Sequence, residues 1–120
     1  MKTILIGEDE LRLNRFYQSA YGSRYNLVIR RDGNEVLAEL EKDDYDFVIL
    51  DNDLRDGPTG IEIIERMHKI GKTNEMKFAL CTCNPDPTLE TRAEENGVAY
   101  FSKCEIIKKP RILTEYFEQQ

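Results

Sequence analysis

The 120-residue sequence predicts an α/β fold in which a parallel sheet of five strands is covered by helices on both faces. Short apolar runs rich in β-branched residues alternate with longer segments whose apolar residues recur at helical spacing. The run at residues 47–50 is apolar throughout, which is typical of a strand buried on both faces of a parallel sheet.

The first half of the chain contains three of these strands and two helices. Residues 7–10 and 32–34 are rich in glycine and polar residues and should form turns. Gly22 follows an amphipathic segment and is a plausible helix terminator. The predicted order is a strand at 2–6, a helix at 11–21, a strand at 27–31, a helix marked by Val36, Leu37 and Leu40, and the strand at 47–50.

The second half repeats the alternation. Glycines at 71 and 97 should end two helices, and Pro110 suits the first turn of the last one. The predicted order is a helix marked by Ile61, Ile63, Ile64, Met67 and Ile70, a strand at 78–83, a helix at 87–96, a strand at 98–102 and a helix with Ile112, Leu113, Tyr116 and Phe117 facing inward.

Charge and composition narrow the function classes. The net charge of −6 and the pI of about 4.9 argue against non-specific binding to nucleic acid or anionic lipid. Charged residues return at position 8, so we expect neither a signal peptide nor a transmembrane helix. Three cysteines without a disulfide-framework spacing favour a reducing cytoplasm.

Reactive side chains follow the ends of four predicted strands. Glu8 and Asp9 follow the first strand, Asp51 ends the third, Thr82 ends the fourth and Lys103 follows the fifth. In an open parallel sheet these positions meet at one edge. Three carboxylates brought together repel one another, which favours a hard divalent cation with a preference for oxygen ligands. Lys103 adds a compact positive charge suited to a phosphoryl group.

Five motifs in this order resemble the receiver domain of bacterial two-component response regulators, over essentially the whole chain. They are ILIGEDE, VILD, the glycine of TGIEII, the threonine of LCTC, and AYFSK. The resemblance implies a flavodoxin-like (βα)5 three-layer sandwich with parallel strand order 2-1-3-4-5. It further implies that residues 1–120 form a single cytoplasmic receiver domain of the stand-alone type.

The resemblance also implies a phosphoacceptor site. Asp51 would accept a phosphoryl group from a histidine kinase or a phosphotransfer protein. Mg²⁺ would be held by Glu8, Asp9 and Asp51 together with the backbone carbonyl of Asp53. Such a domain is not an enzyme beyond catalysing its own phosphorylation and autodephosphorylation.

Three further residues would carry the switch. Lys103 would pair with Asp51 or its phosphate, Thr82 would donate its hydroxyl to a phosphoryl oxygen, and Tyr100 would swing inward as the switch aromatic. The expected output is a protein contact through the face made by the fourth helix, the fifth strand and the fifth helix. We expect no direct contact with nucleic acid or membrane, and either a monomer or a phosphorylation-dependent dimer.

The sequence departs from the family pattern in ways that keep alternatives open. Cys104 stands where a proline usually follows the lysine, which predicts a less constrained loop before the last helix. Arg55 also replaces a common proline, and the loop at 51–60 is one residue longer than usual. These departures favour a second interpretation, in which the chain is a pseudo-receiver that binds a partner without phosphorylation.

A third interpretation is a phosphatase of the haloacid-dehalogenase type, because Asp51-Asn52-Asp53 matches its DxD motif. Against this interpretation, Glu8 and Asp9 precede that motif, whereas the additional acids of that family follow it.

In the loop after the third strand, we expect Asp56 to form a turn with Gly57-Pro58. Because the receiver scheme needs only the backbone carbonyl of Asp53, its side chain would be free to change the lifetime of an acyl phosphate, by orienting an attacking water or by repelling anions.

Two remaining residue types are assigned minor roles. Cys81 and Cys83 lie two apart on a predicted strand and should share a face, and Cys83 could approach Cys104 as a thiol site. Small buried cysteines are nevertheless common. His68, the single histidine, should be solvated on the third helix.

Overall fold

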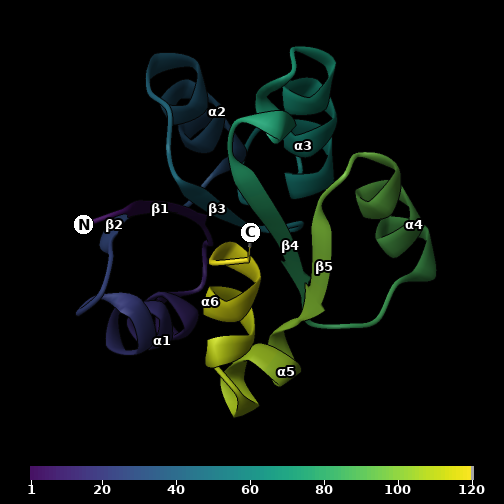
Figure 1. The fold of residues 1–120 in the computed structure, drawn as a ribbon. Coiled ribbons are helices and arrows are strands. Elements are labelled where there is room, and N and C mark those ends of the chain that lie inside the picture. The colour runs from purple at the N-terminus through teal and green to yellow at the C-terminus, as the bar shows by residue number, and fades with distance from the viewer. Residues whose placement is uncertain (120) are drawn as a thin grey trace.

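The computed structural model describes residues 1–119 and contains a five-stranded parallel sheet in the order β2-β1-β3-β4-β5 (Figure 1). The strands are β1 (Thr3–Gly7), β2 (Asn26–Arg30), β3 (Phe47–Asp51), β4 (Lys77–Thr82) and β5 (Ala99–Ser102). Every pair of neighbours is parallel. The predicted strand order and the flavodoxin-like architecture are therefore confirmed.

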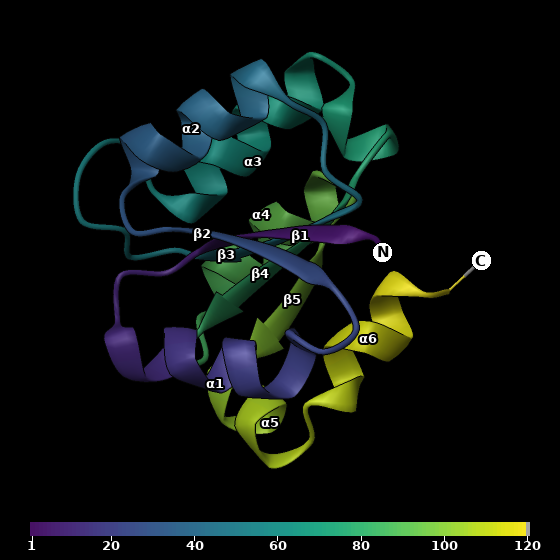
Figure 2. The same ribbon diagram turned by 90° about the vertical axis from the view of Figure 1, so that its left-hand side faces the viewer.

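Helices cover both faces of this sheet, as predicted. Figure 2 shows α2 and α3 on one side of the strands and α1, α5 and α6 on the other. The helices are α1 (Leu11–Tyr21), α2 (Gly33–Lys42), α3 (Gly60–Lys69), α4 (Pro87–Glu95), α5 (Lys103–Lys108) and α6 (Arg111–Phe117), with a 3₁₀ turn at Lys72–Asn74. Within residues 1–119, no helix combines the length and the apolar character needed to span a bilayer.

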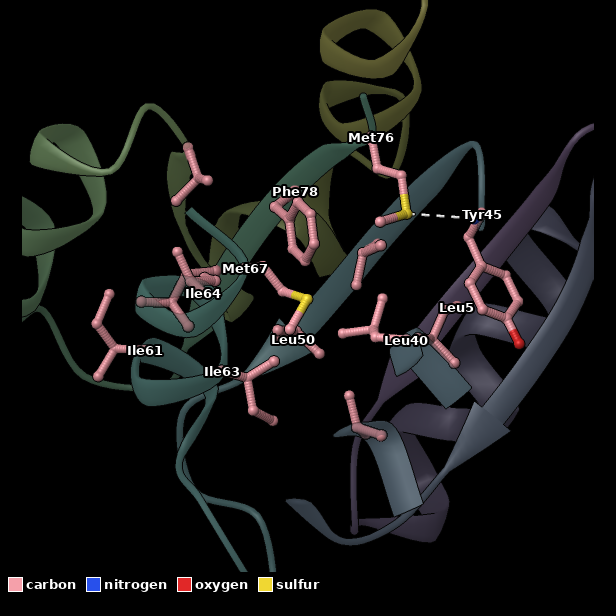
Figure 3. Packing of buried hydrophobic residues seen from close by; sticks show 14 of the residues in the cluster. Leu5, Leu40, Tyr45, Leu50, Ile61, Ile63, Ile64, Met67, Met76 and Phe78 are labelled. Atoms are coloured by element: carbon pink, nitrogen blue, oxygen red, sulfur yellow. Dashed lines mark hydrogen bonds between the residues drawn. The ribbon is translucent and has the colours of Figure 1, made fainter. Parts of the chain in front are cut away.

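The sheet separates two apolar cores. One lies under α2, α3 and α4 and is drawn in Figure 3. There Ile63 and Ile64 of α3 pack on Leu50 and Phe78 of the sheet, and the Met76 sulfur accepts a hydrogen bond of 3.2 Å from the backbone N–H of Tyr45. The other core lies under α1, α5 and α6. All five residues of β3 are buried, because this central strand faces both cores.

Side-chain caps fix where three of the helices begin. Thr59 and Glu62 form a reciprocal capping box at the start of α3. Asp86 accepts hydrogen bonds from the backbone at the start of α4, where Pro87 occupies the first turn. Asp32 accepts from Glu35, so α2 begins at Gly33, inside the segment predicted as a turn.

The segment after β5 corrects the sequence prediction. Residues 103–108 were expected to form a loop, but they form the short helix α5. Cys104, unlike a proline, has an N–H group, and it donates this to the Ser102 hydroxyl at 3.2 Å as a helix cap. Ile106 is buried and anchors this helix to the core. The predicted last helix is α6, which begins directly after Pro110.

The cysteine prediction also needs correction. β4 ends at Thr82, so Cys81 is buried in the sheet whereas Cys83 lies exposed beyond the strand. The two side chains therefore do not share a face. Cys104 is exposed as well, and the three cysteines are free within residues 1–119.

Truncation of one buried isoleucine should show how strongly the stability of the fold depends on the core under α3. Ile63 is fully buried, so Ile63→Ala should lower the free energy of unfolding by about 2–5 kcal/mol through lost contacts and a residual cavity. Ile70, at the end of the same helix, is 64% exposed and provides the matched control. Urea denaturation of both variants tests this, and equal losses would contradict the packing described.

Candidate functional site

The residues predicted to meet at one edge of the sheet do meet there. Gly7 pairs with Leu50, Asp51 with Cys81 and Thr82 with Ser102, so successive strands end at the same side. The backbone N–H of Glu8 extends the ladder of β1 by donating to the carbonyl of Arg30 at 3.0 Å. The carboxyl ends of β1, β3, β4 and β5 thus assemble the candidate site.

Lys103 joins two carboxylates at the centre of the site. Its Nζ lies 2.9 Å from Glu8 Oε1 and 3.1 Å from Asp51 Oδ2. The three residues expose only 1% (Glu8), 6% (Asp51) and 5% (Lys103) of their surface. Since unpaired buried charges are costly, each of these groups depends on the others for its charged state. The Lys103–Asp51 contact was predicted, whereas the shorter contact with Glu8 was not.

Burial and charge shift the protonation equilibria of this group. Burial, followed by the charge of Asp51, raises the pKa of Glu8 to about 7, although Lys103 acts against this shift. Burial also raises the pKa of Asp51, and Lys103 partly opposes it. For Lys103, burial alone would lower the pKa, but the hydrogen bond and charge of Glu8 together with Asp51 outweigh it and raise the pKa.

The donor set suits a hard divalent cation. Carboxylate oxygens of Glu8, Asp9 and Asp51 lie within 4.8 Å of one another. Glu8 Oε1 is buried and, apart from its ion pair with Lys103, has no hydrogen-bond partner within residues 1–119. Oxygen ligands with one or two carboxylates are what Mg²⁺ prefers, so these residues fit it.

Asp53 lies beside this cluster but differs from it in burial. Its side chain is exposed, its backbone N–H donates a hydrogen bond that lowers the pKa of Asp51, and its charge raises that pKa. The predicted role of its carbonyl as a metal ligand stays a prediction. Asp56 belongs to the loop after β3. Its backbone carbonyl accepts hydrogen bonds from the backbone N–H groups of Gly33 (2.6 Å) and Asn34 (3.2 Å).

Thr82 and Tyr100 form a second group at the same edge. Their hydroxyls lie 2.7 Å apart, and the Thr82 hydroxyl also reaches the carbonyl of Asn84 at 3.2 Å. The Tyr100 hydroxyl accepts a hydrogen bond of 3.0 Å from the backbone N–H of Asp86. The loop after β4 is thereby tied to Tyr100. A hollow of about 250 Å³ lies beside Thr82, lined by residues of the loops after β3 and β4.

Local contacts explain how β3 delivers Asp51 to this edge. The Gly60 N–H donates to the Asn52 carbonyl at 3.1 Å, and the Asn52 side chain accepts from the Ile61 N–H at 3.0 Å. A Cβ atom at position 60 would collide with the carbonyl oxygen of Asp51. Glycine at this position therefore allows α3 to begin directly against the end of β3.

Sequence reasoning missed a buried layer behind the site. Asn14 is buried on α1 and donates from Nδ2 to the carbonyl of Glu8 at 2.9 Å. A polar residue on the apolar face of a helix, one turn before Tyr17, was the signal that could have found it. Burial raises the pKa values of the Tyr17 phenol and the Cys81 thiol, so both groups stay neutral. His68 is exposed, as predicted.

Comparison with known proteins identifies the fold. Neither a protein-family model nor a curated protein sequence matches the chain. Solved structures do. A CheY-like response regulator receiver domain protein from Methanospirillum hungatei JF-1 is 22% identical, with a TM-score of 0.79 and coverage of 98% of this chain and 97% of that one.

Two other solved structures agree. The chemotaxis protein CheY4 of Vibrio cholerae is 17% identical, with a TM-score of 0.81 and coverage of 98% of both chains. The Mn²⁺-bound form of response regulator Rcp1 is 18% identical, with a TM-score of 0.85 and coverage of 100% of this chain and 97% of that one. The chain therefore has the fold of the response regulator receiver domains.

Proposed function

We propose that the protein is a phosphorylation-dependent receiver in which Asp51 accepts a phosphoryl group and thereby changes a protein-binding face. The observation that carries this proposal is the meeting of Glu8, Asp9, Asp51 and Lys103 at the edge that also holds the Thr82–Tyr100 pair. Mg²⁺, when bound by the three carboxylates, would neutralise charge on the phosphoryl oxygens. That the similar Rcp1 has an Mn²⁺-bound form supports the binding of a divalent ion.

In this reaction the chain supplies a nucleophile and charge stabilisation. The donor is a phosphorylated histidine on a kinase or phosphotransfer protein. A carboxylate oxygen of Asp51 attacks phosphorus as the P–N bond breaks, and the imidazole nitrogen leaves with the electron pair. Lys103, already 3.1 Å from Asp51, stays beside the acyl phosphate and balances its charge.

The hydroxyl of Thr82 would link the phosphoryl group to the protein-binding face. In the structure described here it contacts Tyr100 and Asn84. When it donates to a phosphoryl oxygen instead, it leaves Tyr100 and the Asn84 carbonyl, so the loop after β4 loses its contact with Thr82 and Tyr100 is free to swing inward. The surface that changes is made by α4, β5 and the predicted fifth helix, α6. A downstream protein would bind there.

Incubation with acetyl phosphate and Mg²⁺, followed by intact-mass measurement, tests this function. We expect the mass to rise by one phosphoryl group and the rise to disappear on mild alkaline treatment, because an acyl phosphate is labile. An unmodified mass would instead support the pseudo-receiver interpretation. Continuous release of phosphate from an aryl phosphate over many turnovers would support the phosphatase interpretation.

Removal of the Tyr100 hydroxyl should uncouple the switch from phosphorylation. Tyr100→Phe loses the contacts with Thr82 and with the N–H of Asp86. We expect unchanged phosphorylation but at least a halving of the phosphorylation-induced amide shifts along α4, measured by NMR. The matched control is Tyr45→Phe, whose hydroxyl contacts Glu39 in a different part of the chain. Full-size shifts in Tyr100→Phe would contradict the coupling.

Replacement of Asp53 should change the lifetime of the acyl phosphate. Its carboxylate lies near enough to Asp51 to raise that pKa and can accept a proton from an attacking water. Asp53→Asn should lengthen the half-life, by up to about a hundredfold, which is the lower end of what a positioned general base contributes. Dephosphorylation is followed by mass spectrometry, with Asp56→Asn as the control in the same loop. Equal half-lives for wild type and Asp53→Asn would rule out this role.

A further inference from the structure

A second concave feature lies at the opposite end of α1 from the phosphoacceptor site. It is a hollow of about 410 Å³ between the last turn of α1 and the corner that joins α5 to α6. Ala20 and Tyr21 contribute one wall, and Pro110 and Thr114 contribute the other. Tyr21 lies roughly 10 Å along the helix from Asn14, the residue that contacts Glu8, at 1.5 Å per residue.

All of the charged residues that line this hollow are cationic. Arg24, Lys108, Lys109 and Arg111 line it, and no carboxylate does. This concentration stands out in a chain whose net charge is −6. Arg24 lies over the ring of Tyr25, at 5.5 Å from its centroid.

Within residues 1–119, most of these cations form no salt bridge. Within the part of the chain that the structure describes, neither Arg24 nor the two lysines form a salt bridge. Arg111 reaches Glu115 at 3.5 Å, but both side chains are well exposed, so the pair is weak and easily exchanged.

A hydrogen bond joins the two walls of the hollow. The Tyr21 side chain is buried, and its hydroxyl donates to the carbonyl of Pro110 at 2.8 Å, which joins α1 to the start of α6. The Thr114 hydroxyl donates to the carbonyl of Arg111 at 3.1 Å. The hydrogen bond from Tyr21 to Pro110 therefore fixes the position of one wall relative to the other.

We propose that this hollow, the basic pocket, binds a small phosphate ester that carries an organic ring, such as a nucleotide. Arginine forks and lysine ammonium groups are the side chains that bind phosphate oxygens. The volume lies within the range of small-molecule sites, and the half-buried Ala20 and Pro110 offer an apolar surface for a ring. A hollow of this volume suits a compact polyanion better than an extended acidic peptide.

Titration of the full chain with ADP in EDTA tests the basic pocket, because EDTA removes the divalent cation that would draw phosphate to Asp51. We expect saturable binding, with amide shifts in the NMR spectrum at Ala20, Tyr21, Lys109 and Thr114. ADP should bind at least about fivefold more tightly than inorganic pyrophosphate if this apolar surface contacts the ring. Shifts confined to the Asp51 edge, no saturation, equal affinities for ADP and pyrophosphate, or tighter binding of hexaglutamate would each overturn the proposal.

A pair of charge-matched variants separates a site from general attraction. Arg24→Gln/Lys108→Gln removes two rim cations, whereas Arg15→Gln/Lys69→Gln removes one arginine and one lysine from exposed positions elsewhere. The first variant should weaken ADP binding at least about tenfold, since it removes two charged hydrogen-bond donors. The second should change it less than about twofold. Equal weakening would mean that the cations only offset the negative ends of α1 and α5.

Discussion

The Asp51→Asn variant is expected to take up no phosphoryl group from acetyl phosphate and Mg²⁺ under conditions that modify the wild type. Asparagine keeps the size of the side chain but lacks the carboxylate nucleophile, so no acyl phosphate can form. We expect no transfer to the neighbouring acids Glu8 and Asp9 either.

The variant should otherwise remain folded, which makes the loss of modification interpretable. Lys103 keeps its contact with Glu8 at 2.9 Å, and the substitution removes a buried negative charge rather than creating one. We therefore expect a melting temperature no lower than that of the wild type. Asp56→Asn, a change of the same chemistry in the exposed loop, should be phosphorylated normally. A phosphoryl group on Asp51→Asn would place the acceptor elsewhere and contradict the proposal.

The second large effect is a fall in stability as pH rises from about 4.5 to about 7 in the absence of divalent cations. The folded state holds the proton of Glu8 up to about pH 7, whereas the unfolded chain releases it near 4.5. The folded protein thus binds more protons across this window, and its free energy of unfolding must decrease with pH. This contribution is complete below 4.5 and lost above 7. It amounts to as much as about 3 kcal/mol, at 1.36 kcal/mol per pKa unit.

Urea denaturation at pH 5 and pH 8 in EDTA measures this effect when wild type is compared with Glu8→Gln. Exposed carboxylates with lowered pKa values, such as Glu62 and Glu118, change stability in the opposite direction in both proteins, so the comparison cancels them. The variant should show a smaller fall than the wild type, because only the raised pKa of Asp51 remains to cause one. Mg²⁺ should stabilise the wild type more at pH 8 than at pH 5, because it competes with the proton on Glu8. Parallel pH profiles would show that Glu8 ionises normally.

The sequence alone predicted the features that depend on residues close together in the chain. An apolar run that ends in an acid defines both β3 and Asp51, and the alternation of strands and helices is enough to bring the strand ends to one edge. The threonine and lysine followed from their positions at strand ends. Nothing in this part of the prediction required knowledge of a tertiary contact.

The features that were missed depend on contacts between distant segments. The six-residue helix α5 has too few residues to be stable by propensity, and burial of Ile106 against the core stabilises it. The Glu8–Lys103 ion pair joins the two ends of the chain. The residue types could suggest that Lys103 pairs with an acid. Only the packed structure shows that its Nζ lies nearer to Glu8 than to Asp51.

The ion pairs at the sheet edge have a consequence for electroneutrality. When fully ionised, three carboxylates and one ammonium group leave this edge with a formal charge of −2. One divalent cation cancels that deficit, whereas a monovalent ion or a single proton cancels half of it. Valence therefore becomes a selection criterion, independent of ionic size. Sodium or potassium at ordinary concentrations would leave the buried edge charged and could not replace a divalent ion.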